Sequence, residues 1–441
     1  MKNIAAITVF TILLFLQNGY AQSDTVSLKR GESVVIDSIS IRGNDITEPI
    51  IILRELTFKI GQQVDSAVLA FNRERIFSLD IFNQVELHVV KHSATPNELL
   101  INVDESWYIY PVPFLDRKEN SWKKISYGVD IQVKNFRGMR EEIGGRIGLG
   151  YDPHISVYYE RPYLIHDRDL YGGVSLSYFN IRNKSLAAEA KYGSTFDQRI
   201  GQFKLVLGKR FLPYQWLGVF SAYYYVESPK YVEGVNASNE RIDRLVSVGA
   251  LYVYDSRDLK QFPQNGYLFE FIYENKGIFG DIESYGILNS DIRAYHQTLF
   301  DIILKARVAS RQVFGNSPHY DNSFLGLGDK IRGYTLQEEG NSRVITQAEM
   351  HYPLFYDYDL KTNFPIIPKQ LQRARVSLFA HIYGDAGVVR YRGEPLTLND
   401  FYSGYGVGLT LLVLPYNSAR VEYGFNDQGK SEINVDIGIS F

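Results

Sequence analysis

The 441-residue sequence contains no cysteine, which excludes a disulfide framework, a thiolate metal site, a cysteine nucleophile and a lipobox. It also lacks an excess of either charge: the formal net charge is -3, so no basic field points to nucleic acid. Beyond the N-terminus there is no long apolar run. The chain has instead 33 Tyr, 26 Phe and 36 Gly, with a mean hydropathy of -0.18. This composition suits either a water-soluble protein or a transmembrane β-barrel.

The N-terminus has the pattern of a secretory signal peptide. Lys2 precedes an apolar run from residue 4 to residue 16, and small residues before Gln22 supply a cleavage site. The alternative is a membrane anchor, but a spanning helix needs roughly 20 apolar residues and this run has about 13. We therefore expect residues 1–21 to be removed by cleavage after Ala21.

Residues 33–105 read as one strand, two helices and two further strands. The segment "VVIDSISIRGN" alternates apolar and polar residues and ends in a Gly-Asn turn. Thr47 is a candidate N-cap for the first helix, and Asp65 or Ser66 for the second. The segments "QVELHVV" and "ELLINVDE" then alternate strictly on either side of a polar turn. This order predicts a small α+β domain.

Residues 106–124 contain aromatics and prolines near their start and indicate an extended linker. From residue 125 to residue 441 the pattern changes to short alternating segments separated by Gly, Asn, Asp and Pro clusters. In the last of these, "EINVDIGISF", one face is apolar and the other polar. About 16 such segments fit the roughly ten-residue template of a membrane-barrel strand, and an even number suits closure.

A soluble β-sandwich or propeller would also show this alternation. However, the polar face carries Asp, Arg, Lys, Asn and Glu in strand after strand, as at Lys305 and Arg307, which favours a water-filled lumen. Tyr-rich strand ends such as "VYYERPY" and "SAYYYV" are typical of the aromatic girdles of membrane barrels. The sequence thus predicts a mainly β protein: a 16-stranded antiparallel transmembrane β-barrel preceded by one small α+β domain.

The same alternation predicts which charges point into the lumen. In "RVITQAEMHYPL", Ala348 and Met350 face lipid, which places Glu349 inside. In "RVSLFAHIYGDAG", Ile382 faces lipid, which places Asp385 inside. Two carboxylates therefore point inward on neighbouring strands.

Four stretches carry a resemblance to known families. Residues 33–105 resemble a polypeptide-transport-associated (POTRA) domain, with "IDSISIRGNDIT" as its opening strand and turn. The stretch "YDSRDLKQFPQNGYLFEF" (254–271) resembles the "D-x-R-D … P-x-x-G" segment of the bacterial surface antigen family. These are outer-membrane assembly factors that include BamA-type insertases and two-partner secretion translocators. "IRGY" resembles their loop-six tip motif, and "YGDAGVV" (383–389) resembles a strand motif that usually reads Phe-x-Asp-x-Gly.

The resemblance covers nearly the whole mature chain, with two departures. Insertases usually carry several POTRA domains, whereas this chain has room for one, so a platform for accessory periplasmic proteins is reduced. Tyr383 replaces the usual Phe of the strand motif, while Asp385 and Gly387 match it.

The resemblance implies that a long loop, residues 311–342, folds into the lumen and brings Arg332 to Glu349 and Asp385. An arginine fork on two carboxylates is a strong and directional contact. Gly333 would allow the tight turn behind it, and Tyr334 completes the motif. The loop is longer than the roughly 12 to 15 residues beyond which an unstructured connection usually has a function. The alternative is an exposed loop arginine without a role.

Three further residues have competing interpretations. Asp255 and Arg257 form either a lumen network or a charged strand end and turn. Phe441 ends the last strand, where the resemblance implies a signal for the assembly machinery. The sequence has no His cluster at metal-ligand spacing, no G-x-S-x-G elbow and no P-loop, so we expect no metal, no cofactor and no enzymatic activity.

The leading functional hypothesis is an outer-membrane protein that inserts or translocates polypeptides. Its POTRA domain would lie in the periplasm and bind unfolded or extended clients at a sheet edge, and a weak barrel seam would offer a second edge. Outer-membrane lipid is the other expected partner. One alternative is a dedicated secretion pore for one exported partner, and another, from a different class, is a passive solute channel. A passive channel would need neither a POTRA domain nor an inward arginine.

Overall fold

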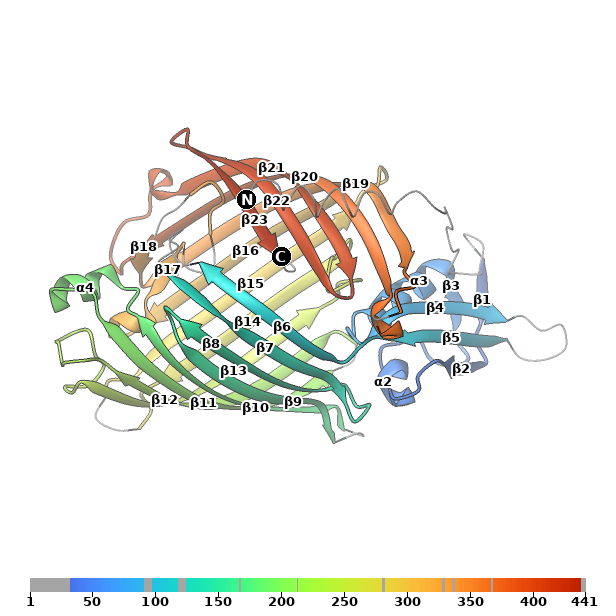
Figure 1. Cartoon of the computed structure of the whole chain (residues 1–441), viewed down its shortest axis with the longest axis horizontal. Coiled ribbons are helices and arrows are strands. Elements are labelled where there is room, and N and C mark those ends of the chain that lie inside the picture. The colour runs from blue at the N-terminus through green and yellow to red at the C-terminus, as the bar shows by residue number, and fades with distance from the viewer. Residues whose placement is uncertain are drawn as a thin grey trace.

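The computed structural model describes residues 32–90, 97–117, 124–165, 168–211, 213–279, 282–326, 330–334, 338–365 and 368–437. They form a small N-terminal α+β domain and a large barrel made by a 16-stranded antiparallel sheet (Figure 1). The mainly β fold expected from the sequence is confirmed. The expected signal peptide, residues 1–21, and Phe441 lie outside the described residues. None of the helices in the described ranges is long and apolar enough to cross a membrane.

The N-terminal domain contains a three-stranded sheet in the order β2-β5-β4, with β2 parallel and β4 antiparallel to β5. The expected order of strand, two helices and two strands is present. The expected first strand is divided in two, because β1 leaves the sheet to pair with the short β3. The elements are β1 (Ser33–Val35), β2 (Ser38–Arg42), α2 (Pro49–Leu53), β3 (Gln63–Asp65), α3 (Ser66–Phe77), β4 (Phe82–Val90) and β5 (Glu98–Glu105).

Local sequence explains how this domain folds. Helix α3 begins where the Asp65 carboxylate accepts a hydrogen bond from the Val68 N–H at 2.8 Å. Thr47, expected to cap α2, does not do so: Glu48 occupies the cap position, and the Thr47 hydroxyl donates to Glu105 at 2.6 Å. That bond ties the start of α2 to the end of β5. The fully buried core lies between α3 and the sheet and includes Leu69, Ile76, Phe77, Leu87, Leu99 and Ile101.

The barrel sheet runs in chain order from β6 to β23, and every neighbouring pair is antiparallel. Two short strands, β17 (Ser323–Leu325) and β18 (Glu338–Gly340), pair with each other outside this sheet. The barrel strands are β6 (Ile109–Arg117), β7 (Ile125–Phe136), β8 (Glu141–Gly150), β9 (His154–Ile165), β10 (Leu170–Arg182), β11 (Asp197–Phe211), β12 (Gln215–Glu227), β13 (Ile242–Asp255), β14 (Gly266–Lys276), β15 (Tyr285–Gln297), β16 (Ile303–Phe314), β19 (Ser342–Lys361), β20 (Arg373–Arg390), β21 (Tyr402–Leu414), β22 (Asn417–Asn426) and β23 (Ser431–Ile437).

Two sequence-based boundaries were wrong. The range 106–124, expected to be a linker, contains β6, which pairs with β7 from Ile109 to Arg117. Its two prolines interrupt the apolar alternation and hid the strand, so the barrel starts before residue 125. The inward loop is also shorter than the expected 311–342, because β16 continues to Phe314 and the connection covers residues 315–341.

The barrel wall has the alternation that the sequence predicts. Ile382 is 51% exposed on the outer face, while its neighbour Tyr383 is 5% exposed on the inner face. Glu349 and Asp385 are both buried inside, as expected. The sheet ends at β6 on one side and at β23 on the other, and no ladder joins these two strands in the described part of the chain. The seam therefore lies between β6 and β23, one strand earlier than expected.

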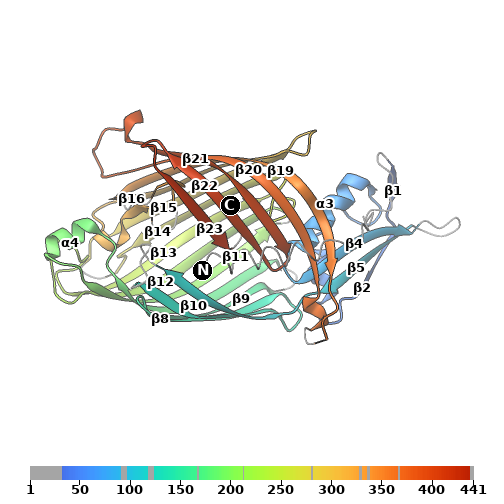
Figure 2. The same cartoon turned by 45° about the horizontal axis from the view of Figure 1, so that its top comes forward.

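The N-terminal domain sits against one end of the barrel, next to the long strands β19 and β20 (Figure 2). Ion pairs join the two parts around this rim. Glu55 pairs with Arg210 of β11 at 2.6 Å, Glu74 with Arg375 of β20 at 3.0 Å, and Asp80 with Lys134 of β7. Because these partners come from distant strands, the domain is fixed across the barrel end rather than attached by its chain connection alone.

Candidate functional site in the barrel lumen

The loop between β16 and β19 reaches the inner wall through a small apolar cluster. Leu325 and Ile331 of the loop pack against Ile345 of β19, and all three side chains are buried. Gly387 of β20 makes room for this cluster, because a Cβ atom there would lie 2.8 Å from the Ile331 side chain. The glycine carried over from the family motif therefore has a local packing reason. These apolar contacts hold the loop tip against the inner wall independently of the charged residues.

Arg332 follows Ile331 and points into the barrel wall. Its Nε and one terminal nitrogen donate to the two oxygens of Asp385 at 2.7 and 2.6 Å, a bidentate pair. The backbone N–H of Arg332 donates to the same carboxylate at 3.1 Å. The other terminal nitrogen donates to Glu349 at 2.6 Å. The structure thus brings together the three charged residues that the sequence pointed to.

A third carboxylate was missed by the sequence analysis. Glu422 of β22 accepts from Arg332 at 2.8 Å, and the guanidinium lies 3.7 Å from the ring centroid of Tyr383. The signal for Glu422 was present: in "ARVEYGFN", Val421 and Tyr423 are the outward apolar residues, so Glu422 points inward by the alternation that located Glu349. We call Arg332, Glu349, Asp385 and Glu422 the loop clamp.

Gly333 and Tyr334 continue the tip along β22. Gly333 has a φ of 90°, and a Cβ atom there would meet the Phe425 backbone at 2.8 Å. Its carbonyl accepts from the Asn426 side chain at 2.9 Å, and the Tyr334 hydroxyl donates to Asp427. The tip is therefore held by side chains at the end of β22 and directly after it, as well as by the carboxylates.

Further buried charges surround the loop clamp. Arg420 donates to Glu349 at 3.0 Å, and His351 and His381 contact Glu349 and Glu422 at 2.6 and 3.0 Å. Lys305 is also buried, with its ammonium 3.5 Å from the ring centroid of Phe262. The formal charges of the three buried cations, Arg332, Arg420 and Lys305, match those of the three carboxylates. Removing any one member leaves an uncompensated charge in a buried site.

Asp255 and Arg257 lie apart from the loop clamp. Arg257 donates to both oxygens of Asp255 at 2.8 and 3.0 Å, and Lys260 lies 3.7 Å from the same carboxylate. Asp255 ends β13, and Arg257 lies in the turn between β13 and β14 (residues 256–265). This turn meets the N-terminal domain where the Lys260 N–H donates to the Ser78 hydroxyl at 3.0 Å. The pair therefore orders a turn at the domain junction, and no contact between it and Arg332 occurs in the described residues.

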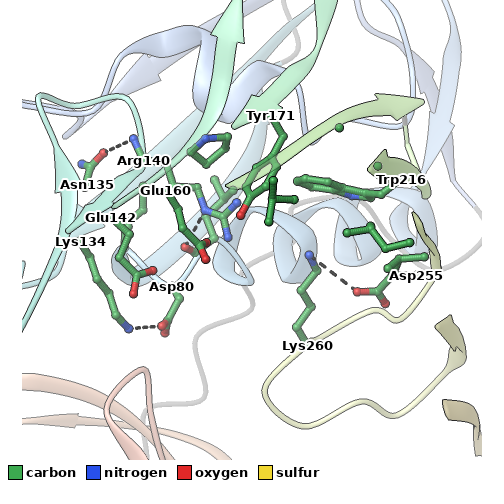
Figure 3. Close-up of a pocket in the computed structure, with 18 of the residues that line it drawn as sticks. Asp80, Lys134, Asn135, Arg140, Glu142, Glu160, Tyr171, Trp216, Asp255 and Lys260 are labelled. Carbon is green, nitrogen blue, oxygen red and sulfur yellow. Dashed lines mark hydrogen bonds and ion pairs between the residues drawn. The ribbon is translucent and has the colours of Figure 1, made fainter. Parts of the chain in front are cut away.

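An open chamber of about 710 Å³ occupies the lumen beside that turn (Figure 3). Its lining combines cations and anions, with Lys134 close to Asp80 and Lys260 close to Asp255 (Figure 3). Tyr171 and Trp216 form an aromatic corner with ring centroids 5.6 Å apart. The loop clamp contacts β19, β20 and β22, whereas the chamber is lined by residues of β7 to β13. The described residues contain no group of His, Asp and Glu arranged to hold a metal ion.

At the barrel end, the carboxyl group of Glu55 lies buried beside two arginines. Burial by itself would raise its pKa, but the guanidinium groups of Arg210 and Arg75 outweigh burial and lower the pKa to about 2. Arg75 donates to Glu55 at 2.8 Å, so one carboxylate joins α3 to the barrel wall. Glu55 therefore stays charged at neutral pH and holds the domain at the rim.

Comparison with known sequences gives two findings. The Omp85 superfamily domain matches residues 135–441. The outer membrane protein assembly factor BamA of Nitratidesulfovibrio vulgaris is 22% identical over 336 residues, which cover 71% of this chain and 39% of that protein. The chain thus spans well under half the length of this curated relative.

Among solved structures, BamA from Haemophilus ducreyi lacking POTRA domains 1-3 is 14% identical with a TM-score of 0.54, covering 92% of this chain and 84% of that one. CdiB from Escherichia coli is 10% identical with a TM-score of 0.52, covering 95% and 92%. At these identities the likeness concerns the fold.

Proposed function

This chain belongs to the Omp85 superfamily, and from that membership and its lumen site we propose that it inserts or translocates polypeptides at the outer membrane. The observation that carries the proposal is the loop clamp: a loop tip held inside the barrel by one arginine and three carboxylates. A passive solute channel needs neither this tip nor a domain fixed across its end. The protein acts by binding polypeptide, and we assign it no enzymatic activity.

The N-terminal domain acts in this proposal as a single periplasmic POTRA domain. Its order of strand, two helices and two strands supports the assignment, as does its place at the barrel end. Strand β4 is covered near the barrel, since the Asn83 side chain donates to the Gln370 carbonyl at 2.7 Å. Strand β2 pairs with β5 alone in the described part of the domain, so its other edge is the one that an extended client can join by strand addition.

Depletion of the protein followed by a survey of the surface proteome tests the proposal. Loss of many outer-membrane barrels supports insertion, and loss of one exported protein supports a dedicated secretion pore. An unchanged proteome with altered uptake of small solutes would contradict both and favour a channel. A charge-preserving variant with a blocked β2 edge, Ile39→Pro, should reduce delivery of the same clients while the barrel still folds.

A further inference from the structure

The turn between β13 and β14, residues 256–265, is an ordered unit. The Asp258 carboxylate accepts three hydrogen bonds from backbone N–H groups of the same turn at 2.8 to 3.0 Å, those of Leu259, Gln264 and Asn265. Gly266 closes the turn with a φ of 111°, and a Cβ atom there would lie 2.4 Å from the Ser256 carbonyl oxygen. These contacts fix the backbone that carries the side chains of the turn.

Side chains of this turn contact two different parts of the lumen. Lys260 lines the open chamber and points to Asp255 (Figure 3). Phe262, two residues later, is 3% exposed, and its ring centroid lies 4.5 Å from that of Phe379 and 5.4 Å from that of His351. Phe379 belongs to β20 and His351 to β19. The turn therefore contacts the open chamber on one side and the surroundings of the loop clamp on the other.

Two buried nitrogen atoms next to Phe262 have no hydrogen-bond partner in the described part of the chain. They are the Lys305 Nζ atom and the His351 Nδ1 atom. The Lys305 ammonium lies 3.5 Å from the Phe262 ring centroid, and the His351 ring meets Phe262 edge to face. A buried ammonium without a hydrogen bond is costly, and the face of an aromatic ring offsets part of that cost. Phe262 thus stabilises Lys305 where hydrogen bonds do not.

Both neighbours of Phe262 lie next to Glu349, the clamp carboxylate on β19. Lys305 stands opposite Glu349 in the β16–β19 ladder, and the His351 Nε2 atom lies 2.6 Å from a Glu349 oxygen. Glu349 also accepts a hydrogen bond from Arg332 at 2.6 Å. Water in place of the Phe262 ring would offer hydrogen bonds to both unpaired nitrogen atoms. It would then compete with Glu349 for Lys305 and His351.

We propose that Phe262 is a positioning residue of the loop clamp, whose ring separates Lys305 and His351 from the water of the open chamber. Both side chains then stay next to Glu349, and the pair between Glu349 and Arg332 stays buried. Exclusion of water strengthens that pair because charges attract each other more strongly where the effective dielectric constant is low. The inference concerns how the loop tip is held, and its importance for polypeptide transport rests on the proposed function.

Protease cleavage within the loop, residues 315–341, measures the effect on the full-length protein in nanodiscs. Phe262→Ala should speed cleavage by roughly 2- to 13-fold, the range expected for one lost aromatic contact. Phe262→Leu restores an apolar cover without a ring face, so its rate should fall between those of alanine and wild type. Leu259→Ala is the matched control, because it removes another buried side chain from the same turn and leaves Phe262 in place. Equal acceleration by Leu259→Ala would show a loosened turn and overturn the proposal.

A double variant separates positioning from a general loss of stability. In Arg332→Ala the clamp no longer holds the tip, so adding Phe262→Ala should change the cleavage rate by less than roughly 2-fold. If the two effects multiply instead, Phe262 acts independently of the clamp and the proposal is overturned. Heat-modifiable migration shows whether each barrel is folded, and Phe262→Leu takes the place of Phe262→Ala if the alanine variant does not fold. Faster cleavage with unchanged client delivery would support the inference and contradict the proposed function.

Discussion

Replacing Arg332 with alanine should release the loop tip from the lumen without unfolding the barrel. Arg332→Ala leaves Glu349, Asp385 and Glu422 with only Arg420 and Lys305 to balance them, a formal excess of one negative charge. A water-filled lumen would screen that charge. However, the Arg332 side chain is 10% exposed, and those of the three carboxylates are 0 to 1% exposed. The cost therefore belongs to the class of broken buried pairs, about 3–5 kcal/mol.

This cost destabilises the docked position of the loop and not the barrel wall, because the loop tip can leave the lumen. Once the tip leaves, water reaches the carboxylates and the penalty ends, whereas the strand ladders of the wall are unchanged. A change of about 3–5 kcal/mol raises the population of the released loop by roughly 10² to 10⁴. Protease cleavage within residues 315–341 follows that population when opening is fast relative to cleavage. We therefore expect rapid cleavage of the loop in Arg332→Ala and unchanged heat-modifiable migration of the barrel.

Variants that restore or keep the charge balance of the loop clamp test this explanation. In the double variant Arg332→Ala/Glu422→Gln, two carboxylates face two cations again, so cleavage should be slower than in Arg332→Ala alone. Arg332→Lys keeps the charge but loses the bidentate fork, so it should fall between wild type and alanine. The exposed Arg392 supplies the control, and Arg392→Ala should behave as wild type. Wild-type cleavage and full client delivery in Arg332→Ala would refute the reasoning.

Three other predictions concern separate parts of the chain. Gly404→Ala should loosen the loop tip, because its Cβ atom would lie 1.9 Å from the Arg332 carbonyl oxygen. Gly384→Ala is the control, because its Cβ atom would meet no atom within 4 Å, and proteolysis of the loop compares the two variants. Glu55, with its pKa lowered to about 2 in the folded state, stabilises the domain junction above pH 4.5 and loses that contribution, on the order of 3 kcal/mol, as pH falls from 4.5 towards 2. Thermal melts against pH should show this loss in wild type and not in Glu55→Gln. Deletion of Phe441 should lower the amount of folded protein in the outer membrane but spare refolding in detergent, and equal loss in both assays would contradict an assembly role.

The sequence could predict the wall of the barrel because the two faces of each strand meet surroundings of opposite polarity. Alternation placed Glu349 and Asp385 inside without any knowledge of the fold, and it would have placed Glu422 there too. It failed at β6, where Pro111 and Pro113 suggest a break although they lie within the first strand of the described sheet. Proline signals a break only if its N–H would have been used, and that depends on whether a neighbouring strand exists.

The docking of the N-terminal domain was beyond sequence reasoning for a different reason. The pairs Glu55–Arg210 and Glu74–Arg375 join residues 155 and 301 positions apart, and no local pattern links such partners. From sequence alone, a charged residue in a helix or at a strand end is expected to lie in solvent. The role of the clamp residues in client handling, like the assembly role of Phe441, stays a prediction.

The contacts of the clamp make the two sides of the seam unequal. Arg332 donates to Glu422, and the Gly333 carbonyl accepts from the Asn426 side chain; both partners belong to β22, the strand to which β23 is paired. The clamp therefore ties this side of the seam to β19 and β20. On the other side, β6 pairs only with β7 in the described part of the chain. If the seam opens, the movable side is therefore β6 with its neighbours. Seam opening in this arrangement does not require release of the loop tip.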